Sequence, residues 1–382
     1  MKPLVSVIRC PGYDQEMVDR AVRASITSVC DPSEIIRPGH RVLIKPNLLA
    51  KARPEKAVTT HPSLVRALIN LVKELGAHPV VGDSPGGVNT EAAVRGIYRE
   101  SGIGEVCRQE GVPIVDFETN VVEVNLPGGK LYRKMTVARA SRDVDAIITV
   151  PKLKTHGFMM LTCGIKILFG LVPGLSKANY HLKMSRKEEF ADMLLDLYSY
   201  AAPRLTVVDG VVAMEGNGPA HGVPRKLDLI LASTDSVALD VVVSEVIGYR
   251  LEEVPTNLAA VKRGLTGELQ DLEIVGEDLD EVRVSDFVKP ITRGVVRGVP
   301  PFLKHLLKDI SSPKPVSNES RCTLCRVCVD NCPSQAMRVE KERVLIDYQE
   351  CIRCYCCHEL CPEGAIELRV HPLARPFVHT GS

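Results

Sequence analysis

Two short runs of cysteine have the spacing of ligands for iron–sulfur clusters. The run from Cys322 to Cys332 and Pro333 reads C-x2-C-x2-C-x3-C-P, and the run from Cys351 to Cys361 and Pro362 repeats it 29 residues later. Three thiolates spaced by two residues wrap one [4Fe-4S] cluster, and the fourth is directed to the partner cluster. The spacing therefore predicts two [4Fe-4S] clusters, held by Cys322, Cys325, Cys328 and Cys361 (cluster 1) and by Cys351, Cys354, Cys357 and Cys332 (cluster 2).

Other uses of these cysteines fit the spacing less well. Zinc sites also use C-x2-C pairs, but they do not need a third thiolate and a C-P ending in both runs. Disulfides are not expected, because each patterned cysteine is needed as a thiolate. Nine of the 13 cysteines lie between Cys322 and Cys361, and the pattern leaves out only Cys356 among them. We interpret Cys356 as a passive neighbour of ligand Cys357.

A basic segment earlier in the chain could bind an anion. Residues 146–187 contain seven Lys and Arg and no Asp or Glu, whereas the chain average of 47 acids in 382 residues would place about five there. Because the segment is also apolar and rich in glycine, several of its ammonium groups are expected to face a partly desolvated pocket. A small carboxylate or phosphate is the ligand that such a pocket needs.

Two alternatives remain for these lysines. They could form a solvated helix face, or they could dock the cysteine module, whose residues 318–370 include nine acids and seven bases. Docking is compatible with anion binding if the pocket lies where the two parts of the chain meet.

Apolar strands and amphipathic helices alternate before the cysteine runs. This order is typical of a mostly parallel α/β sheet flanked by helices, followed here by a small α+β C-terminal domain with two [4Fe-4S] clusters. A hairpin is expected at 121–138. The remaining strands are expected at 4–8, 41–45, 79–82, 146–150, 205–208 and 227–231, and the helices at 14–29, 62–75, 90–100, 186–201 and 236–247.

Changes in composition divide the chain into four parts. Residues 1–286 are expected to form the α/β domain, and the irregular, proline-containing stretch 287–317 a linker. The cluster domain is assigned to 318–370. The patternless tail, 371–382, is expected to be poorly ordered.

Several motifs resemble a known family. From Arg41 to about Asp240 the chain is similar to the iron–sulfur proteins grouped as domain of unknown function 362, often fused to a ferredoxin module, and residues 318–370 resemble two-cluster bacterial ferredoxins. Where members of the family commonly read Lys-Asn, this chain has Lys166-Ile167. The resemblance implies an architecture more than a reaction. It rests on the segments 44–48, 59–62, 151–156, 165–171, 209–210 and 215–219, with Lys177 and His181.

The site residues follow from the basic segment, from the strand ends and from these motifs. Ligands of open α/β sheets bind beyond the carboxyl ends of the strands. We assign catalytic roles to His156, Lys152 and Lys154, with His156 transferring protons because neighbouring positive charge keeps it neutral. Anion binding is assigned to Lys45, Asn47, Lys166, Lys177 and His181.

Two further side chains have a structural alternative. His61 could belong to the site or could only cap the helix that follows it. Cys163 is flanked by apolar residues and is expected in the core.

Charge and hydropathy restrict the partners. A formal net charge of +1 gives no basic excess for a nucleic-acid backbone. No secretory signal follows Met1, so a cytoplasmic location is expected. The apolar stretch 157–175 is not expected to span a membrane, because Lys166 lies near its middle and glycine and proline interrupt it.

We therefore expect an iron–sulfur oxidoreductase. In this hypothesis an electron donor or acceptor protein exchanges electrons with the clusters, and a small anionic substrate or cofactor binds in the large domain. A non-catalytic electron carrier or assembly protein that docks a redox enzyme is the alternative. An isomerase or racemase with structural clusters is a third possibility. No nucleotide-binding glycine motif is present to indicate NAD, FAD or ATP.

Overall fold

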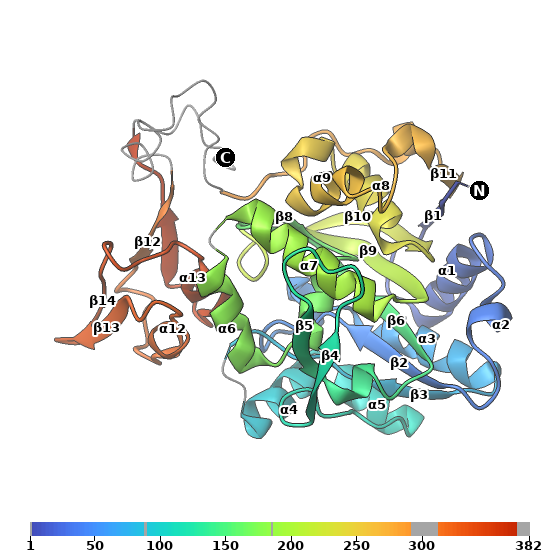
Figure 1. Cartoon of the computed structure of the whole chain (residues 1–382), viewed down its shortest axis with the longest axis horizontal. Coiled ribbons are helices and arrows are strands. Elements are labelled where there is room, and N and C mark those ends of the chain that lie inside the picture. The colour runs from blue at the N-terminus through green and yellow to red at the C-terminus, as the bar shows by residue number, and fades with distance from the viewer. Residues whose placement is uncertain (1, 88–89, 185, 292–311, 373–382) are drawn as a thin grey trace.

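A computed structural model describes residues 2–87, 90–184, 186–291 and 312–372, which form two parts (Figure 1). The larger part is a β-sheet with helices on both faces. The smaller part, coloured red in Figure 1, is the cysteine module and lies at one side of the larger part. This confirms the predicted α/β class with a small C-terminal domain. In the described residues, no helix is both long enough and apolar enough to cross a membrane.

Nine strands of the described residues form the main sheet in the order β11-β1-β10-β9-β6-β2-β3, with β7 paired to β9 and β8 paired to β7. Most neighbours are parallel, but β10 is antiparallel to β1 and β9, and β8 to β7. A short loop joins β9 to β10, which makes this pair antiparallel. The strands are β1 (Leu4–Arg9), β2 (Arg41–Pro46), β3 (His78–Val81), β6 (Ala146–Val150), β7 (Lys152–His156), β8 (Met160–Thr162), β9 (Leu205–Glu215), β10 (Val223–Ser233) and β11 (Glu273–Gly276).

Alternating side chains of the sheet explain why helices cover both faces. Val42 and Ile44 of β2 pack in the core with α1 and α3, whereas Leu43 packs on the opposite side with α7. The helices are α1 (Gln15–Thr27), α2 (Pro32–Ile35), α3 (Pro62–Glu74), α4 (Glu91–Glu100), α5 (Ile103–Glu110), α6 (Gly174–Lys183), α7 (Lys187–Ala201), α8 (Ser236–Val246), α9 (Pro255–Lys262) and α10 (Leu279–Val282). The expected hairpin is β4 (Val121–Asn125) with β5 (Lys134–Ala138). Short 3-10 helices are η1 (Pro54–Lys56), η2 (Arg139–Ser141), η3 (Lys166–Leu171), η4 (Leu251–Glu253) and η5 (Leu269–Asp271).

The cysteine module has an internal repeat. Strand β12 (Lys314–Ser317) pairs with β15 (Ile366–Arg369), and β14 (Arg343–Ile346) pairs with β13 (Met337–Glu340). Helix α12 (Val327–Asp330) follows the first cysteine loop, and α13 (Cys356–Leu360) follows the second. Each element of the second half begins 29 residues after its counterpart, which is the offset of the two cysteine runs.

The repeat corrects the expected boundary of the linker. Residues 314–317, assigned to the linker, form β12, because the module needs a counterpart to β14 to pair with β15. Applying the 29-residue offset to β14 gives 314 as the first residue of β12. Residues 292–311 of the expected linker and 373–382 of the expected tail lie outside the described residues.

Candidate functional site

Cysteines from both runs meet in the module. Cys322, Cys325 and Cys328 line one small cavity together with Cys361, which comes from the second run. The thiol of Cys361 accepts a hydrogen bond from the backbone N–H of Ala365 at 3.1 Å. Burial raises the pKa of the Cys328 thiol to about 11, and the three neighbouring thiols also raise it. Cys361 therefore lies with the first run, where the predicted ligand set for cluster 1 requires it.

The second group of cysteines lies around the buried Cys357. Burial raises the pKa of the Cys357 thiol well above its usual value, and the neighbouring thiols of Cys354, Cys351 and Cys332 raise it further. Cys332 comes from the first run, so each run lends its last cysteine to the other group. None of the 13 cysteines is in a disulfide.

The backbone of both cysteine loops fits cluster binding. Leu324 and Arg326 flank the second cysteine of the first loop with φ of 56° and 65°, and Arg353 and Tyr355 flank its counterpart with 56° and 66°. Non-glycine residues rarely adopt positive φ. Its recurrence at equivalent positions indicates that both loops are shaped to direct several thiols inward, as [4Fe-4S] ligation requires. Within the described residues, no three His, Cys, Asp or Glu side chains are grouped to hold a single metal ion.

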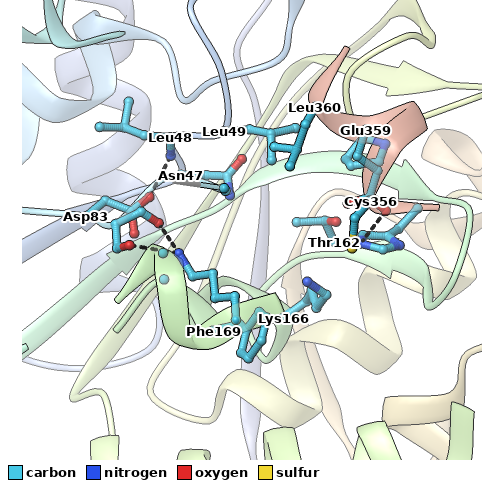
Figure 2. Close-up of a pocket in the computed structure, with 18 of the residues that line it drawn as sticks. Asn47, Leu48, Leu49, Asp83, Thr162, Lys166, Phe169, Cys356, Glu359 and Leu360 are labelled. Carbon is cyan, nitrogen blue, oxygen red and sulfur yellow. Dashed lines mark hydrogen bonds and ion pairs between the residues drawn. The ribbon is translucent and has the colours of Figure 1, made fainter. Parts of the chain in front are cut away.

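A cavity of about 100 Å³ lies between the large domain and the module (Figure 2). We call it the interdomain pocket. Figure 2 shows Asn47, Leu48 and Asp83 of the large domain on one side and residues of α13 on the other. The large domain contributes Asn47, Leu48, Leu49, Asp83, Ser84, Gly86, Gly87, Lys154, His156, Thr162, Lys166, Ile167, Phe169, Gly170, Gly174, Lys177, Ala178, His181 and Pro219, and the module contributes Asn331, Cys356, Glu359 and Leu360.

The interdomain pocket is next to the second group of cysteines. Cys356 lies between ligands in the sequence and lines the pocket, and Asn331 precedes Cys332. Cys356 therefore lies between the pocket lining and a predicted ligand of cluster 2 in the sequence, and its interpretation as a passive neighbour of Cys357 stays a prediction. Helix α13 places Glu359 one turn after Cys356, on the same side.

Three lysines of the pocket have no carboxylate within ion-pair distance in the described part of the chain. The Lys154 ammonium donates to the carbonyl of Val58 at 2.6 Å. The Lys177 ammonium donates to the carbonyl and hydroxyl oxygens of Ser84 and to the carbonyl of Pro85. Among the described residues, the Lys166 ammonium has no carboxylate or hydrogen-bond acceptor as a partner, and it lies 5.0 Å from the centre of the Phe169 ring.

Burial of this charge shifts the pKa values. Burial lowers the pKa of Lys154 to about 7, and the nearby Lys166 lowers it further. Burial also lowers the pKa of Lys177 to about 7. On the module side, burial raises the pKa of Glu359 to about 7, against the opposing effect of Lys166 and Lys154. The pocket therefore has more cationic than anionic groups, and an anionic ligand would correct the imbalance.

Lys45 does not face the pocket as predicted. Its ammonium is 2.6 Å from Oδ1 of Asp83, and both side chains are almost fully buried. The other carboxylate oxygen of Asp83 accepts from the backbone N–H of Leu48. Lys45 is already neutralised by an acid 38 positions away in the sequence, and it supports Asp83, which lines the pocket.

Lys152 also lies outside the pocket. Its ammonium is bound to Asp209 at 2.9 Å and to the Tyr13 hydroxyl at 2.8 Å. Residues 152, 154 and 156 alternate along β7, and Lys152 is at the start of the strand, two residues before Lys154. The Tyr13 ring is stacked on His61, whose Nδ1 accepts from the backbone N–H of Ser63 as the N-cap of α3. Lys152 and His61 are therefore parts of a buried structural network.

The hydrogen bonds of His156 determine which nitrogen carries its proton. Nδ1 accepts from the backbone N–H groups of Phe158 and Met159 at 3.1 and 3.2 Å. Burial and the nearby Lys166 hold the pKa of His156 well below 6.5, so the ring is neutral. A neutral ring with an accepting Nδ1 carries hydrogen on Nε2, which lies 3.4 Å from Oε1 of Glu359. His156 thus has no free lone pair for a base, and it contacts Glu359 across the domain boundary.

Four buried polar atoms of the pocket lining have no hydrogen-bond partner among the described residues: Asn47 Oδ1, Thr162 Oγ1, His181 Nδ1 and Glu359 Oε1. Buried polar atoms normally have partners, so Asn47, Thr162 and His181 of the large domain are available to a ligand. His181 is stacked on Phe190, which fixes its ring.

Cys163 belongs to the core, as expected. Its thiol is fully buried and interacts with the carboxylate of Asp240. Asp240 also accepts from the backbone N–H groups of Gly164 and Ile165 at 2.6 and 3.0 Å, directly before η3. This carboxylate therefore fixes the segment that carries Lys166.

Sequence reasoning did not identify the residues that the module adds to the pocket. Glu359 and Leu360 follow a cysteine ligand, and Asn331 precedes one, but no local pattern shows which side of the module faces the large domain. Thr162 was missed because a single threonine in an apolar strand has no distinctive spacing. A repeat-based comparison would not have found Glu359 either, because its counterpart Asp330 does not line the pocket.

Comparisons with known proteins agree with this two-part organisation. A family model described as "Domain of unknown function (DUF362)" matches residues 42–245, and one described as "4Fe-4S dicluster domain" matches 314–362. "Thylakoid-associated protein sll1697" of Synechocystis sp. is 32% identical over 310 residues, which cover 79% of this chain and 94% of that protein. "Uncharacterized ferredoxin MJ0199" of Methanocaldococcus jannaschii is 33% identical over 45 residues, 12% of this chain and 73% of that protein. The lactate racemase apoprotein of Thermoanaerobacterium thermosaccharolyticum aligns with a TM-score of 0.40 and 12% identity, over 63% of this chain and 56% of that chain.

Proposed function

The chain belongs to the DUF362 family and carries a 4Fe-4S dicluster domain, and on this premise we propose that it is an oxidoreductase that acts on a small anion in the interdomain pocket. The observation that carries the proposal is the composition of the pocket. Buried lysines of the large domain face the module helix that holds a predicted ligand of cluster 2. Electron transfer needs short distances, and the helix that lines the pocket also carries Cys357, a predicted ligand of cluster 2.

The predicted cysteine sets would hold two [4Fe-4S] clusters, which supply one-electron transfer when bound. Cys325 is exposed, so a one-electron carrier protein could approach cluster 1 from solvent. Each electron that the carrier loses is gained by the anion in the pocket.

In this proposal the side chains of the pocket have separate tasks. Lys166 binds the anion, because its ammonium lacks a polar partner in the described residues. Lys154 donates a proton, since a pKa of about 7 suits proton transfer near neutral pH. His156 is a positioning residue, because its Nε2 lies 3.4 Å from Oε1 of Glu359. Lys177 fixes the Ser84 loop, and Asn47, Thr162 and His181 offer hydrogen bonds to the ligand.

Replacing Lys166 tests the proposal directly. Isothermal titration calorimetry with acetate and with inorganic phosphate measures binding to the cluster-loaded protein. We expect Lys166→Met to weaken binding at least about tenfold, because it removes the unpaired cation. Iron content and the visible absorption of the clusters should not change.

Lys183→Met is the matched control, because Lys183 belongs to the same basic segment but is exposed. It should leave the affinity unchanged. If neither anion binds, or if the two variants bind as the unmodified protein does, the pocket is not an anion site. An electron carrier that docks a partner enzyme would then be the better description.

The cytoplasmic location expected from the sequence stays a prediction. The 32% identical relative is described as thylakoid-associated, and this description applies to that protein.

A further inference from the structure

The two groups of predicted cluster ligands lie in different surroundings. The group of Cys351, Cys354, Cys357 and Cys332 adjoins the interdomain pocket through Cys356 and Asn331. The group of Cys322, Cys325, Cys328 and Cys361 includes the exposed Cys325. Cluster 2 would therefore be enclosed by both domains, and cluster 1 would be nearer to solvent.

Buried positive charge is concentrated near the ligands of cluster 2. Lys166 interacts electrostatically with Cys356 and with Glu359, and Lys154 also interacts with Glu359. Arg353, only 4% exposed, lies in the second cysteine loop and interacts with Cys351. Three buried cations of the described residues thus lie on this side of the module, and Glu359 is the module carboxylate that faces the two lysines.

The cations near the ligands of cluster 1 are exposed and already paired. Arg321 forms an ion pair with Glu367, and Arg326 with Asp330. The side chains of both arginines are about half exposed, at 49% and 56%. Solvent and the paired carboxylates screen most of their charge.

This difference in charge should affect the reduction potentials. Reduction adds one electron to a cluster and makes it more negative, so nearby positive charge favours the reduced form. The effect is larger in a buried environment, where screening is weak. Net charge and surroundings are among the factors that determine the potential of an iron–sulfur cluster.

We infer that Lys166, with Lys154 and Arg353, raises the reduction potential of cluster 2 above that of cluster 1. Electrons would then pass from the exposed cluster to the one beside the pocket, with one electron leaving the first and entering the second and no bond formed or broken. The inference rests on the proposed function for its meaning, because it gives the direction of electron flow toward the pocket. Its test does not depend on binding of any anion.

An EPR-monitored redox titration of the cluster-loaded protein tests the inference. We expect two potentials in the unmodified protein. Lys166→Met should shift the higher potential downward and leave the lower one nearly unchanged. Lys166→Arg keeps the positive charge, so its higher potential should stay close to that of the unmodified protein. Replacement of the exposed lysine in Lys183→Met should change neither potential.

The inference is overturned if Lys166→Met leaves both potentials unchanged, moves the lower one, or moves both equally. The inference is also overturned if the unmodified protein shows a single potential for both clusters and Lys166→Met does not separate it into two. If Lys166→Met does not take up the normal amount of iron, Lys166→Gln gives the same comparison with a polar side chain. Anion binding that fails while the higher potential still shifts would reject the proposed substrate site and keep the electron route.

Discussion

At the scale of single residues, the buried lysines differ in what neutralises them. Lys45 and Lys152 are each bound to a buried aspartate, so they contribute structure and not a binding charge. Lys154 and Lys177 donate to neutral oxygens, and Lys166 contacts an aromatic ring. Removing one partner of a buried ion pair costs about 3–5 kcal/mol, whereas an unpaired buried cation is itself costly unless a ligand balances it. The unpaired lysines are therefore the ones with a functional explanation.

The lowered pKa of Lys154 predicts a pH dependence of anion binding. Its pKa in the folded protein is about 7, so the ammonium is charged below pH 7 and loses its proton above it. Lys177 has a pKa of about 7 as well. We expect acetate affinity, measured by calorimetry, to fall as the pH rises from 6 to 8. Lys154→Met should bind more weakly at pH 6 and show a smaller fall, since Lys177 still titrates.

Linkage gives the corresponding sign for stability. Between pH 7 and 10.5 the unfolded chain holds a proton on Lys154 that the folded chain lacks, so this residue makes the protein more stable as the pH rises through that window. The calorimetric test of pH dependence has a clear contrary outcome. An acetate affinity that is constant from pH 6 to 8 would show that neither Lys154 nor Lys177 titrates in the pocket.

At the scale of elements, one carboxylate holds the segment that presents Lys166. Asp240 of α8 accepts two backbone N–H groups directly before η3. Gly164 allows this approach, because a Cβ there would lie 2.9 Å from Oδ1 of Asp240 and from the backbone oxygen of Ser236. The position of Lys166 is thus determined by a residue 74 positions later in the chain.

Removing this carboxylate should affect both stability and binding. We expect Asp240→Ala to lower the free energy of unfolding by about 1–3 kcal/mol, because two buried N–H groups lose their acceptor. It should also weaken acetate binding, because η3 is no longer held in place. Chemical denaturation and calorimetry measure the two effects.

Asp235→Ala is a suitable control on the same helix. Asp235 caps α8 by accepting from Val237 and Ala238, so its loss should cost about 1 kcal/mol without changing acetate binding. Equal binding by the two variants would show that Asp240 has only a general stabilising role.

At the scale of the whole molecule, the pocket exists only where the two domains meet. Gly86 and Gly87 of the large domain lie against the module. A Cβ on Gly86 would lie 3.0 Å from Leu360, and one on Gly87 would lie 2.8 Å from Oδ1 of Asn331. Glycine at these positions therefore lets α13 approach the lysines.

Gly87→Ala should loosen this contact. Hydrogen exchange measured by mass spectrometry is expected to become faster in peptides that cover α13, because the new methyl group pushes Asn331 away. Gly128→Ala is the matched control, since Gly128 also has positive φ but an open space around its Cβ position. Faster exchange of α13 in both variants, or in neither, would contradict the role of Gly87 in docking.

The sequence by itself predicted the cluster ligands and determined most of the fold. Ligation of a cluster needs thiols within one short loop, so the spacing of Cys322 to Cys332 and of Cys351 to Cys361 is informative without a structure. Helices and strands can also be predicted locally, because each has its own hydrophobic periodicity along the sequence. The 29-residue offset between the two cysteine runs also predicts β12 from β14. The proline content of residues 314–317 instead indicated a linker.

Only the tertiary structure decided which lysines serve the pocket. The acids that neutralise Lys45 and Lys152 are 38 and 57 positions away, and Glu359 comes from another domain. Charges interact through space and have no fixed spacing along the chain. A basic segment therefore predicts that an anion is needed, while the fold determines whether an aspartate, the module or a ligand provides it.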